Sequence, residues 1–235
     1  MSCDHRSGLR WRRDGVVSLM LLGLVLLWDA SGLDLPLARL AGGAAGFPWR
    51  DHWLLATVLH QGARLAAFAA AGWLLLGFWR PVGPLKWLPS GARLQWLASL
   101  LLTVLLVNWF KHTSHTSCPW DLVPFGGAVG YVPHWPWLMG DGGAGHCFPA
   151  GHASAGFGFI GGYFALRGHS TRAARACLWL AAGAGLVLGA TQQLRGAHFM
   201  SHTLWTAWLS WASAVAVQAW AAAGRRVVAP AGAPA

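Results

Sequence analysis

Six apolar stretches constrain this chain more than any other feature of its sequence. Each is close to the roughly 20 residues that an α-helix needs to cross the hydrocarbon core of a bilayer. They cover about residues 14–31, 54–79, 94–111, 149–167, 176–194 and 198–223. Only 10% of the residues are charged, whereas a soluble domain has about 25%. The sequence therefore predicts an all-α, polytopic membrane protein built as a six-transmembrane-helix bundle.

The chain is expected to form one membrane-embedded domain over residues 1–235. The fifth and sixth stretches are separated by only a few residues, which predicts a tight helical hairpin. Arg64 interrupts the second stretch and is expected either to face the bundle interior or to snorkel to the interface. The tail 224–235 ends in "VVAPAGAPA" and is expected to be disordered. The net charge of +10 does not indicate nucleic-acid binding, because the basic residues are scattered between apolar runs.

The basic residues also predict how the chain is oriented, since Lys and Arg concentrate in cytoplasmic loops. Segment 112–148 has no Lys or Arg and is expected to face the periplasm of a bacterial cell, with both termini cytoplasmic and the protein in the inner membrane. Residues 1–30 also resemble a signal peptide, but six spans fit the charge pattern better, so this segment is interpreted as an uncleaved first span. Twelve of the 17 basic residues lie on the predicted cytoplasmic side: Arg6, Arg10, Arg12, Arg13, Arg80, Lys86, Arg93, Arg167, Arg172, Arg175, Arg225 and Arg226.

Two of the four cysteines, Cys118 and Cys147, fall in the outward segment. In an oxidising compartment they could pair, and we predict a disulfide between them; the alternative is two unpaired thiols.

Polar groups gather at three predicted outward helix ends. The third stretch ends in "NWFKHTSHTSCPWDL", which carries Lys111. The fourth begins with "FPAGH", and the last hairpin carries "TQQLRGAHFMSH". Charged and ionisable groups at membrane depth are costly and usually functional. The convergence of three such ends predicts one polar site at the outer surface.

The start of the fourth stretch is suited to binding an anion. Pro149 is compatible with the first turn of a helix, because its missing N–H would have no partner there. The backbone N–H groups of Ala150, Gly151 and His152 would then be free at the positive end of the helix dipole. Gly151 would let an anion approach the backbone closely. His152 would lie beside it, able to give or take a proton.

Residues 95–222 resemble the type 2 phosphatidic acid phosphatase family, whose helical core is shared with vanadium haloperoxidases. That family shows KxxxxxxRP, PSGH and SRxxxxxHxxxD in this order. Here "KHTSHTSCP" keeps Lys111 and Pro119 but has Cys118 in place of Arg. "PAGH" has Ala150 in place of Ser. In "TQQLRGAHFMSH", His198 matches, while Gln192 and His202 replace the Arg and the Asp. "RGAHFMSH" also resembles the third motif of family members that act on lipid A.

The resemblance implies a lipid phosphatase that works through a phosphohistidine. His198 would be the nucleophile, and His152 would protonate the leaving oxygen and then activate water. Lys111 and the amides of Ala150 and Gly151 would hold the phosphoryl oxygens. No cofactor or metal is expected. The substrate would be a lipid phosphate or diphosphate in the membrane, with the oligomeric state left open.

The departures from the family pattern suggest substitutes. Arg195 lies one helical turn after Gln192 and is predicted to bind phosphate with it. His202 lies four residues after His198 and is predicted to orient it as a neutral acceptor; Asp121 or Asp141 is the alternative. A shifted register would make His202 the nucleophile.

Three other function classes stay open on the residues alone. One is an inactive relative that binds a phospholipid without turnover. Another is a zinc-binding membrane protein using His112, His115, Cys118 and His146. The third is a transporter, although the chain shows no pair of broken helices in matching halves.

Overall fold

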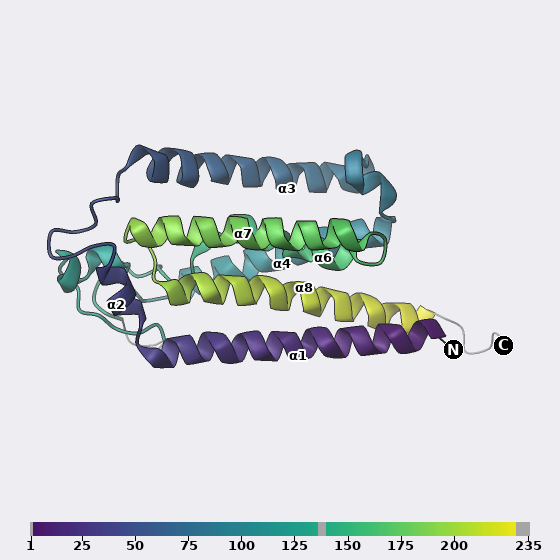
Figure 1. The fold of residues 1–235 in the computed structure, drawn as a ribbon, viewed down its shortest axis with the longest axis horizontal. Helices are drawn as coiled ribbons and strands as arrows, with labels where there is room; N and C mark the ends of the chain where they lie inside the picture. The colour runs from purple at the N-terminus through teal and green to yellow at the C-terminus, as the bar shows by residue number, and fades with distance from the viewer. Residues whose placement is uncertain (1, 136–139, 229–235) are drawn as a thin grey trace.

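The computed structural model describes residues 2–135 and 140–228, which fold into a bundle of long, roughly parallel helices (Figure 1). The long helices are α1 (Ser2–Ser31), α3 (Ala63–Trp79), α4 (Ser90–Thr113), α7 (Thr171–Leu194) and α8 (Met200–Val228). A π-helix, η1 (Leu54–Gly62), leads into α3. The shorter elements are α2 (Asp34–Arg39), α5 (Ser154–Phe157), α6 (Gly161–Leu166) and the 3-10 turns η2 (Gly83–Trp87), η3 (Pro119–Asp121), η4 (Val123–Phe125), η5 (Gly151–Ala153) and η6 (Gly158–Ile160). The predicted all-α class is confirmed.

The predicted count of six membrane spans is not established by the structure. Within the described residues, four segments are long and apolar enough to cross a membrane: Arg12–Ser31, Leu54–Trp87, Ser90–Thr113 and Thr171–Leu194. The fourth predicted stretch forms a run of short helical pieces from η5 to α6. The sixth predicted stretch forms α8, which is long but less apolar.

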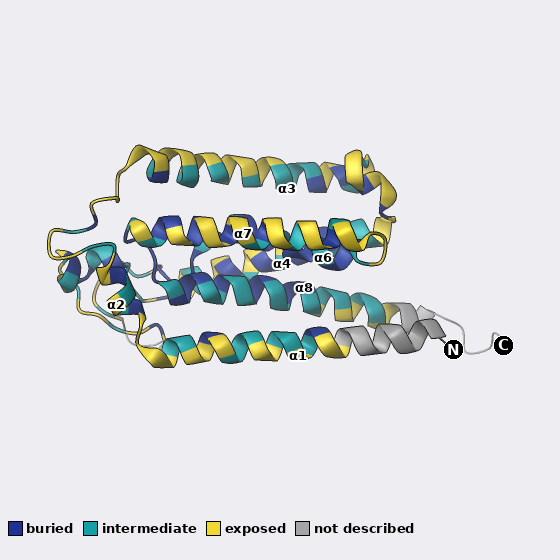
Figure 2. Ribbon diagram, viewed as in Figure 1, coloured by how far each residue is buried: buried dark blue, intermediate teal, exposed yellow. Residues whose placement is uncertain are grey.

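The lower hydropathy of α8 follows from its place in the bundle. It packs between α1 and α4, and four of its small polar side chains, Thr203, Thr206, Ser210 and Ser213, are buried. Figure 2 shows α8 largely buried or intermediate, while the outer face of α3 is exposed. A helix that faces protein can carry hydroxyl groups, because nearby carbonyls can accept their hydrogen bonds. Ser210, for example, donates to the carbonyl of Thr206. The Thr203 and Ser213 hydroxyls are buried without a hydrogen-bond partner among the described residues.

Close backbone contact joins the segment after His152 to α7. A Cβ atom on Gly156 would lie 2.2 Å from the backbone nitrogen of Gly185. Since this contact has no room for a side chain, glycines at both positions let α5 and α7 approach each other. The hairpin between α7 and α8 is as short as predicted, with residues 195–199 between the helices. Gly196 turns this loop with a φ of 73°, and Phe47 packs where its side chain would be.

The connections sort to the two ends of the bundle (Figure 1). The start of α1, the end of α8 and the α3–α4 and α6–α7 connections lie at one end. Arg167 and Asp14 form a buried ion pair of 2.6 Å near that end. The α4–α5 and α7–α8 connections and α2 lie at the other end. This arrangement agrees with the predicted grouping of the basic loops with the chain ends.

The predicted disordered tail needs one correction. α8 continues to Val228, so the segment predicted to be disordered from residue 224 begins as helix. Residues 229–235 lie outside the described residues.

Candidate active site

The three motifs predicted to meet do lie together, at the end of the bundle opposite the chain ends. Lys111 is in the last turn of α4, His152 is in η5, and His198 is in the loop before α8. The Lys111 side chain runs past Gly151, since a Cβ built on that glycine would lie 3.6 Å from Lys111 Cδ. His198 interacts electrostatically with both Lys111 and His152. One site therefore contains a lysine and two histidines from distant parts of the sequence.

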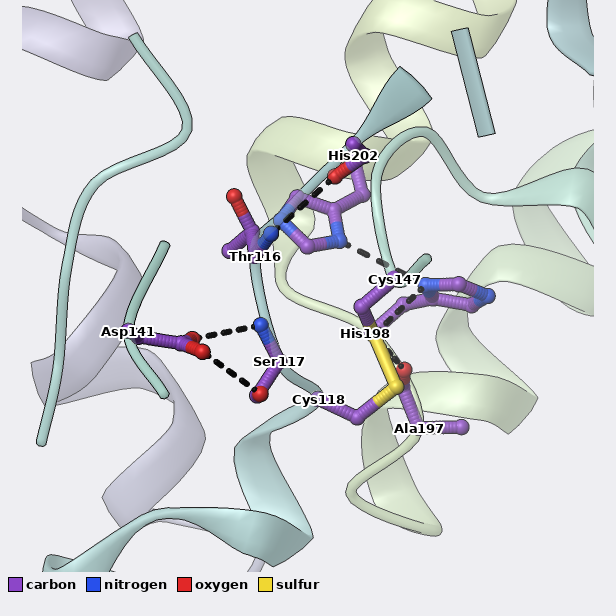
Figure 3. Close-up of a disulfide and its surroundings, with 9 residues drawn as sticks. Thr116, Ser117, Cys118, Asp141, Cys147, Ala197, His198 and His202 are labelled. Carbon is purple, nitrogen blue, oxygen red and sulfur yellow. Dashed lines mark hydrogen bonds between the residues drawn. A yellow bond between two sulfur atoms is a disulfide. The ribbon is translucent and has the colours of Figure 1, made fainter. Parts of the chain in front are cut away.

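His198 and His202 form a buried pair of imidazoles. The two Nδ1 atoms are 3.4 Å apart, and the residues are 7% and 1% exposed. In a pair of neutral rings one Nδ1 must donate and the other must accept. Figure 3 shows Nδ1 of His198 turned toward His202 and the neighbouring disulfide. The predicted contact between these residues is thus present, although His198 precedes α8 instead of lying within it.

Burial controls the charge of His198. It lowers the pKa of His198 to about 3, and the positive charge of Lys111 acts in the same direction. The ring is therefore neutral at neutral pH. A neutral imidazole whose Nδ1 carries the proton has a free lone pair on Nε2, which is the form that a nucleophile requires.

A disulfide joins the first two motifs. Cys118 and Cys147 are bonded across 29 residues of sequence, as the sequence predicted. The Cys147 sulfur lies 3.6 Å from Nδ1 of His198 and 2.9 Å from the carbonyl oxygen of Ala197 (Figure 3). The disulfide therefore joins Cys118, where the family pattern has an Arg, to Cys147, which contacts the loop that carries His198.

Hydrogen bonds add further ties between the same loops. The backbone of Cys147 donates to the carbonyl of Thr116 at 3.0 Å, and Trp120 donates to the carbonyl of Gly196 at 3.0 Å. Asp141 accepts from the backbone and the hydroxyl of Ser117, at 2.6 and 2.9 Å. The prediction that Asp141 could orient His198 is therefore wrong, because its carboxylate is bonded to Ser117 instead (Figure 3).

The predicted anion cradle at residues 150–152 is smaller than expected. The N–H of Ala150 donates to the carbonyl of His202 at 3.2 Å, so it is not free to bind phosphate. Pro149 also lies before the helical turn, which begins at Gly151. The Ala150 correction follows from the packing of this segment on the first two turns of α8, where Thr206 also donates to the carbonyl of Ala150. The amides of Gly151 and His152 remain as the candidate donors.

Arg195 and Gln192 are neighbours, as their spacing predicted. The Arg195 guanidinium donates to the side-chain oxygen of Gln192 at 3.2 Å and to the carbonyl of Arg50 at 2.8 Å. Partial burial lowers the pKa of Arg195, opposed by the nearby charge of Asp51, and the group stays cationic. Its charge reaches His152, so Arg195 contributes positive potential on the His152 side of the site.

His60 is a site residue that the sequence interpretation missed. Its ring stacks on His152 with centroids 4.0 Å apart and 9° between the planes. Its carbonyl oxygen accepts from Nε2 of His152 at 2.7 Å. Because a carbonyl can only accept, Nε2 carries a hydrogen and Nδ1 is the nitrogen left for proton exchange. The signal in the sequence was a cluster of polar residues, His60, Gln61 and Arg64, inside an apolar stretch; Arg64 itself is exposed.

The metal site considered from the sequence is not assembled as predicted. The Cys118 sulfur is in the disulfide, and His146 binds the carbonyl of Lys111 through Nδ1. Over residues 2–135 and 140–228, the group with metal-type side chains close together is Cys147, His198 and His202, whose ligand atoms lie within 4.8 Å of one another. The disulfide occupies the Cys147 sulfur, so two imidazoles remain.

Comparison with known proteins identifies a family match for this chain. The family model described as the PAP2 superfamily matches residues 92–226, which include all three motifs. No curated protein matches the chain. No solved structure matches it either.

Proposed function

Since the chain belongs to the PAP2 superfamily, whose members are phosphatases, we propose that it removes a phosphate from a membrane lipid phosphate or diphosphate. The reaction would take place at the periplasmic face of a bacterial inner membrane. The observation that carries the proposal is the buried His198–His202 pair beside Lys111 and His152. It combines a neutral nucleophile with a cation and a proton carrier in one place.

In the proposed first step, Nε2 of His198 attacks phosphorus. A P–N bond forms while the bond from phosphorus to the lipid oxygen breaks. His152 enters this step protonated on both ring nitrogens; it keeps its Nε2 hydrogen on the carbonyl of His60 and gives its Nδ1 proton to the departing oxygen, so the lipid alcohol leaves as a neutral molecule. The Nδ1 proton of His198 stays in the contact with His202, which helps to hold the ring in the attacking orientation.

In the second step, water attacks the phosphohistidine. His152 takes a proton from this water, the P–N bond breaks, and inorganic phosphate leaves. In this proposal Lys111, Arg195 and the amides of Gly151 and His152 hold the phosphoryl oxygens. Fixed donors of this kind stabilise the charge that develops in the transition state.

The phosphoenzyme provides the direct test. The unaltered protein, mixed with a ³²P-labelled lipid phosphate and quenched, should retain a label that is stable to base and labile to acid. His198→Asn should retain none, because the nucleophile is absent. His169→Asn is the matched control, since His169 is an exposed histidine of the α6–α7 connection, which lies at the opposite end of the bundle. A full label in His198→Asn, or activity that follows bound zinc, would end the proposal.

The lipid itself is addressed by a second experiment. The resemblance of "RGAHFMSH" to the motif of lipid A phosphatases supports lipid A as one candidate, beside phosphatidate, phosphatidylglycerol phosphate and polyprenyl diphosphate. A strain that lacks the protein should accumulate the phosphorylated substrate, which profiling of its membrane lipids would identify. The same strain separates an inactive relative from an enzyme, because loss of an inactive protein leaves all of these phosphates unchanged.

A further inference from the structure

His202 occupies the position where the family pattern has an aspartate, so the phosphohistidine would form without a carboxylate next to His198. Building on the proposed function, we propose that Asp29 supplies this missing negative charge from α1, acting through His134 and His202. Asp29 and His134 would then be positioning residues for His198. Asp29 lies outside residues 92–226, the part of the chain that the family model matches.

Asp29 is placed where such a charge would act. Its side chain is 4% exposed, and its Oδ2 lies 3.5 Å from Nε2 of His134, whose side chain is 7% exposed. Oδ2 also accepts from Nε1 of Trp205 at 2.8 Å. Since Trp205 follows His202 by three residues on α8, this bond fixes the carboxylate against the same helix. The other oxygen, Oδ1, is buried with no hydrogen-bond partner among the described residues.

His134 connects Asp29 to the catalytic pair. Its ring stands edge-to-face with His202 at a centroid distance of 5.8 Å, and it stacks on Phe148 at 4.2 Å. Nε2 of His134 has no hydrogen-bond partner in the described part of the chain other than this ion-pair contact with Asp29. The described residues thus form a continuous series: Asp29, His134, His202 and His198.

Asp34, the other buried carboxylate near this end, has a different role. It accepts from the backbone N–H and the hydroxyl of Ser201 and from Nε1 of Trp28. These bonds cap the first turn of α8, so its charge is offset by the helix end. Asp29, by contrast, forms an ion-pair contact with His134, and a buried carboxylate within an apolar helix is costly and usually functional.

The negative charge of Asp29 would stabilise an intermediate of the proposed reaction. Attack by Nε2 leaves the His198 ring cationic, with its proton on Nδ1 shared with His202. A buried cation needs a nearby anion. Asp29 would stabilise this state through the polarised rings of His202 and His134, much as an outer-shell carboxylate orients and polarises a histidine ligand.

The test is a double-mutant cycle on the rate of phosphoenzyme formation in the full-length protein. We expect Asp29→Asn to slow this step about tenfold, at the lower end of the effects of outer-shell partners. The asparagine oxygen can still accept from Trp205, which preserves the packing. Once His134→Phe has broken the series, Asp29→Asn should cost little more, because residues that act as one unit are not additive. In a His202→Asp background, which places a carboxylate next to His198, Asp29→Asn should also lose most of its effect.

Asp14→Asn is the matched control. Asp14 is also a buried aspartate of α1 but pairs with Arg167 at the far end of the bundle, so its loss should change stability without changing the phosphorylation rate. Equal costs of Asp29→Asn with and without His134 would overturn the inference, and so would an unchanged rate in Asp29→Asn. If the unaltered protein forms no phosphoenzyme, the proposed function itself has failed.

Discussion

The disulfide between Cys118 and Cys147 allows a quantitative prediction about stability and activity. We expect its removal, in the double variant Cys118→Ala/Cys147→Ala, to lower the free energy of unfolding. The bond spans 29 residues, and closing a loop of this length in the unfolded chain removes entropy worth about 3.6 kcal/mol at 25 °C. Cys147 is fully buried, so alanine leaves only a small space.

Activity should fall together with stability, because the bond adjoins the nucleophile. The Cys147 sulfur is 3.6 Å from Nδ1 of His198, and the 112–118 segment is attached to α4, which carries Lys111. Without the bond, the loops of the first two motifs are held by backbone hydrogen bonds, by Asp141 and by the contact of His146 with the carbonyl of Lys111. A displacement of about 1 Å can cost on the order of 100-fold in rate.

The assay is denaturant unfolding in detergent micelles, with and without a dithiol reductant, beside phosphate release. Cys177→Ala is the control, since Cys177 is the free, partly buried cysteine of α7. Reductant should destabilise the unaltered protein by about the same amount as the double alanine variant, and should leave that variant unchanged. Free thiols at both positions in freshly isolated membranes, or an equal loss in Cys177→Ala, would refute the reasoning.

Four further outcomes are expected. Arg195→Ala should lower activity by about 100- to 1,000-fold, the usual cost of one oxyanion donor, whereas the exposed Arg39→Ala should leave it near normal; equal small effects would exclude Arg195 as a ligand. His152→Ala should strongly slow phosphoenzyme formation from lipid substrates but slow it much less from an aryl phosphate, because a good leaving group needs no proton; an equal loss on both in this first step would contradict its role as the acid. Vanadate should inhibit by mimicking five-coordinate phosphorus, while EDTA should not, and the reverse pattern would favour a metal enzyme. A reporter inserted at Gly140 that works only outside the cytoplasm should be active, and cytoplasmic activity there would reverse the predicted orientation.

Local information was sufficient for much of the fold. Long apolar runs have few alternatives to helices in a membrane protein, since every backbone polar group must be satisfied within the segment. The boundaries of α4, α7 and α8 accordingly fall within about five residues of those expected. The number of membrane spans could not be predicted from the apolar runs in the same way. Apolar composition alone does not show whether a helix faces lipid or protein, and α8 faces protein along much of its length.

The candidate site also combines features that local sequence predicts with features that depend on tertiary contacts. The order and spacing of the motifs singled out Lys111, His152 and His198, which the structure brings together at one end of the bundle. The spacing of four residues also identified His202, since it reflects local helix geometry. Ala150 was assigned wrongly as a phosphate donor because its N–H bonds to a carbonyl of α8, 52 residues further along the chain. No local pattern contains that information.

What the sequence by itself determined is the class of the chain, the course of its helices and the chemical types gathered at one end. Tertiary structure decided which of these groups touch. Stacking of His60 on His152 and the approach of Asp29 to His134 depend on how η1 and α1 pack beside the motif-bearing helices. His60 and His152 are 92 positions apart in the sequence, and Asp29 and His134 are 105 positions apart. Helix periodicity reaches only three or four residues along the chain, so contacts of this range arise only when the bundle closes.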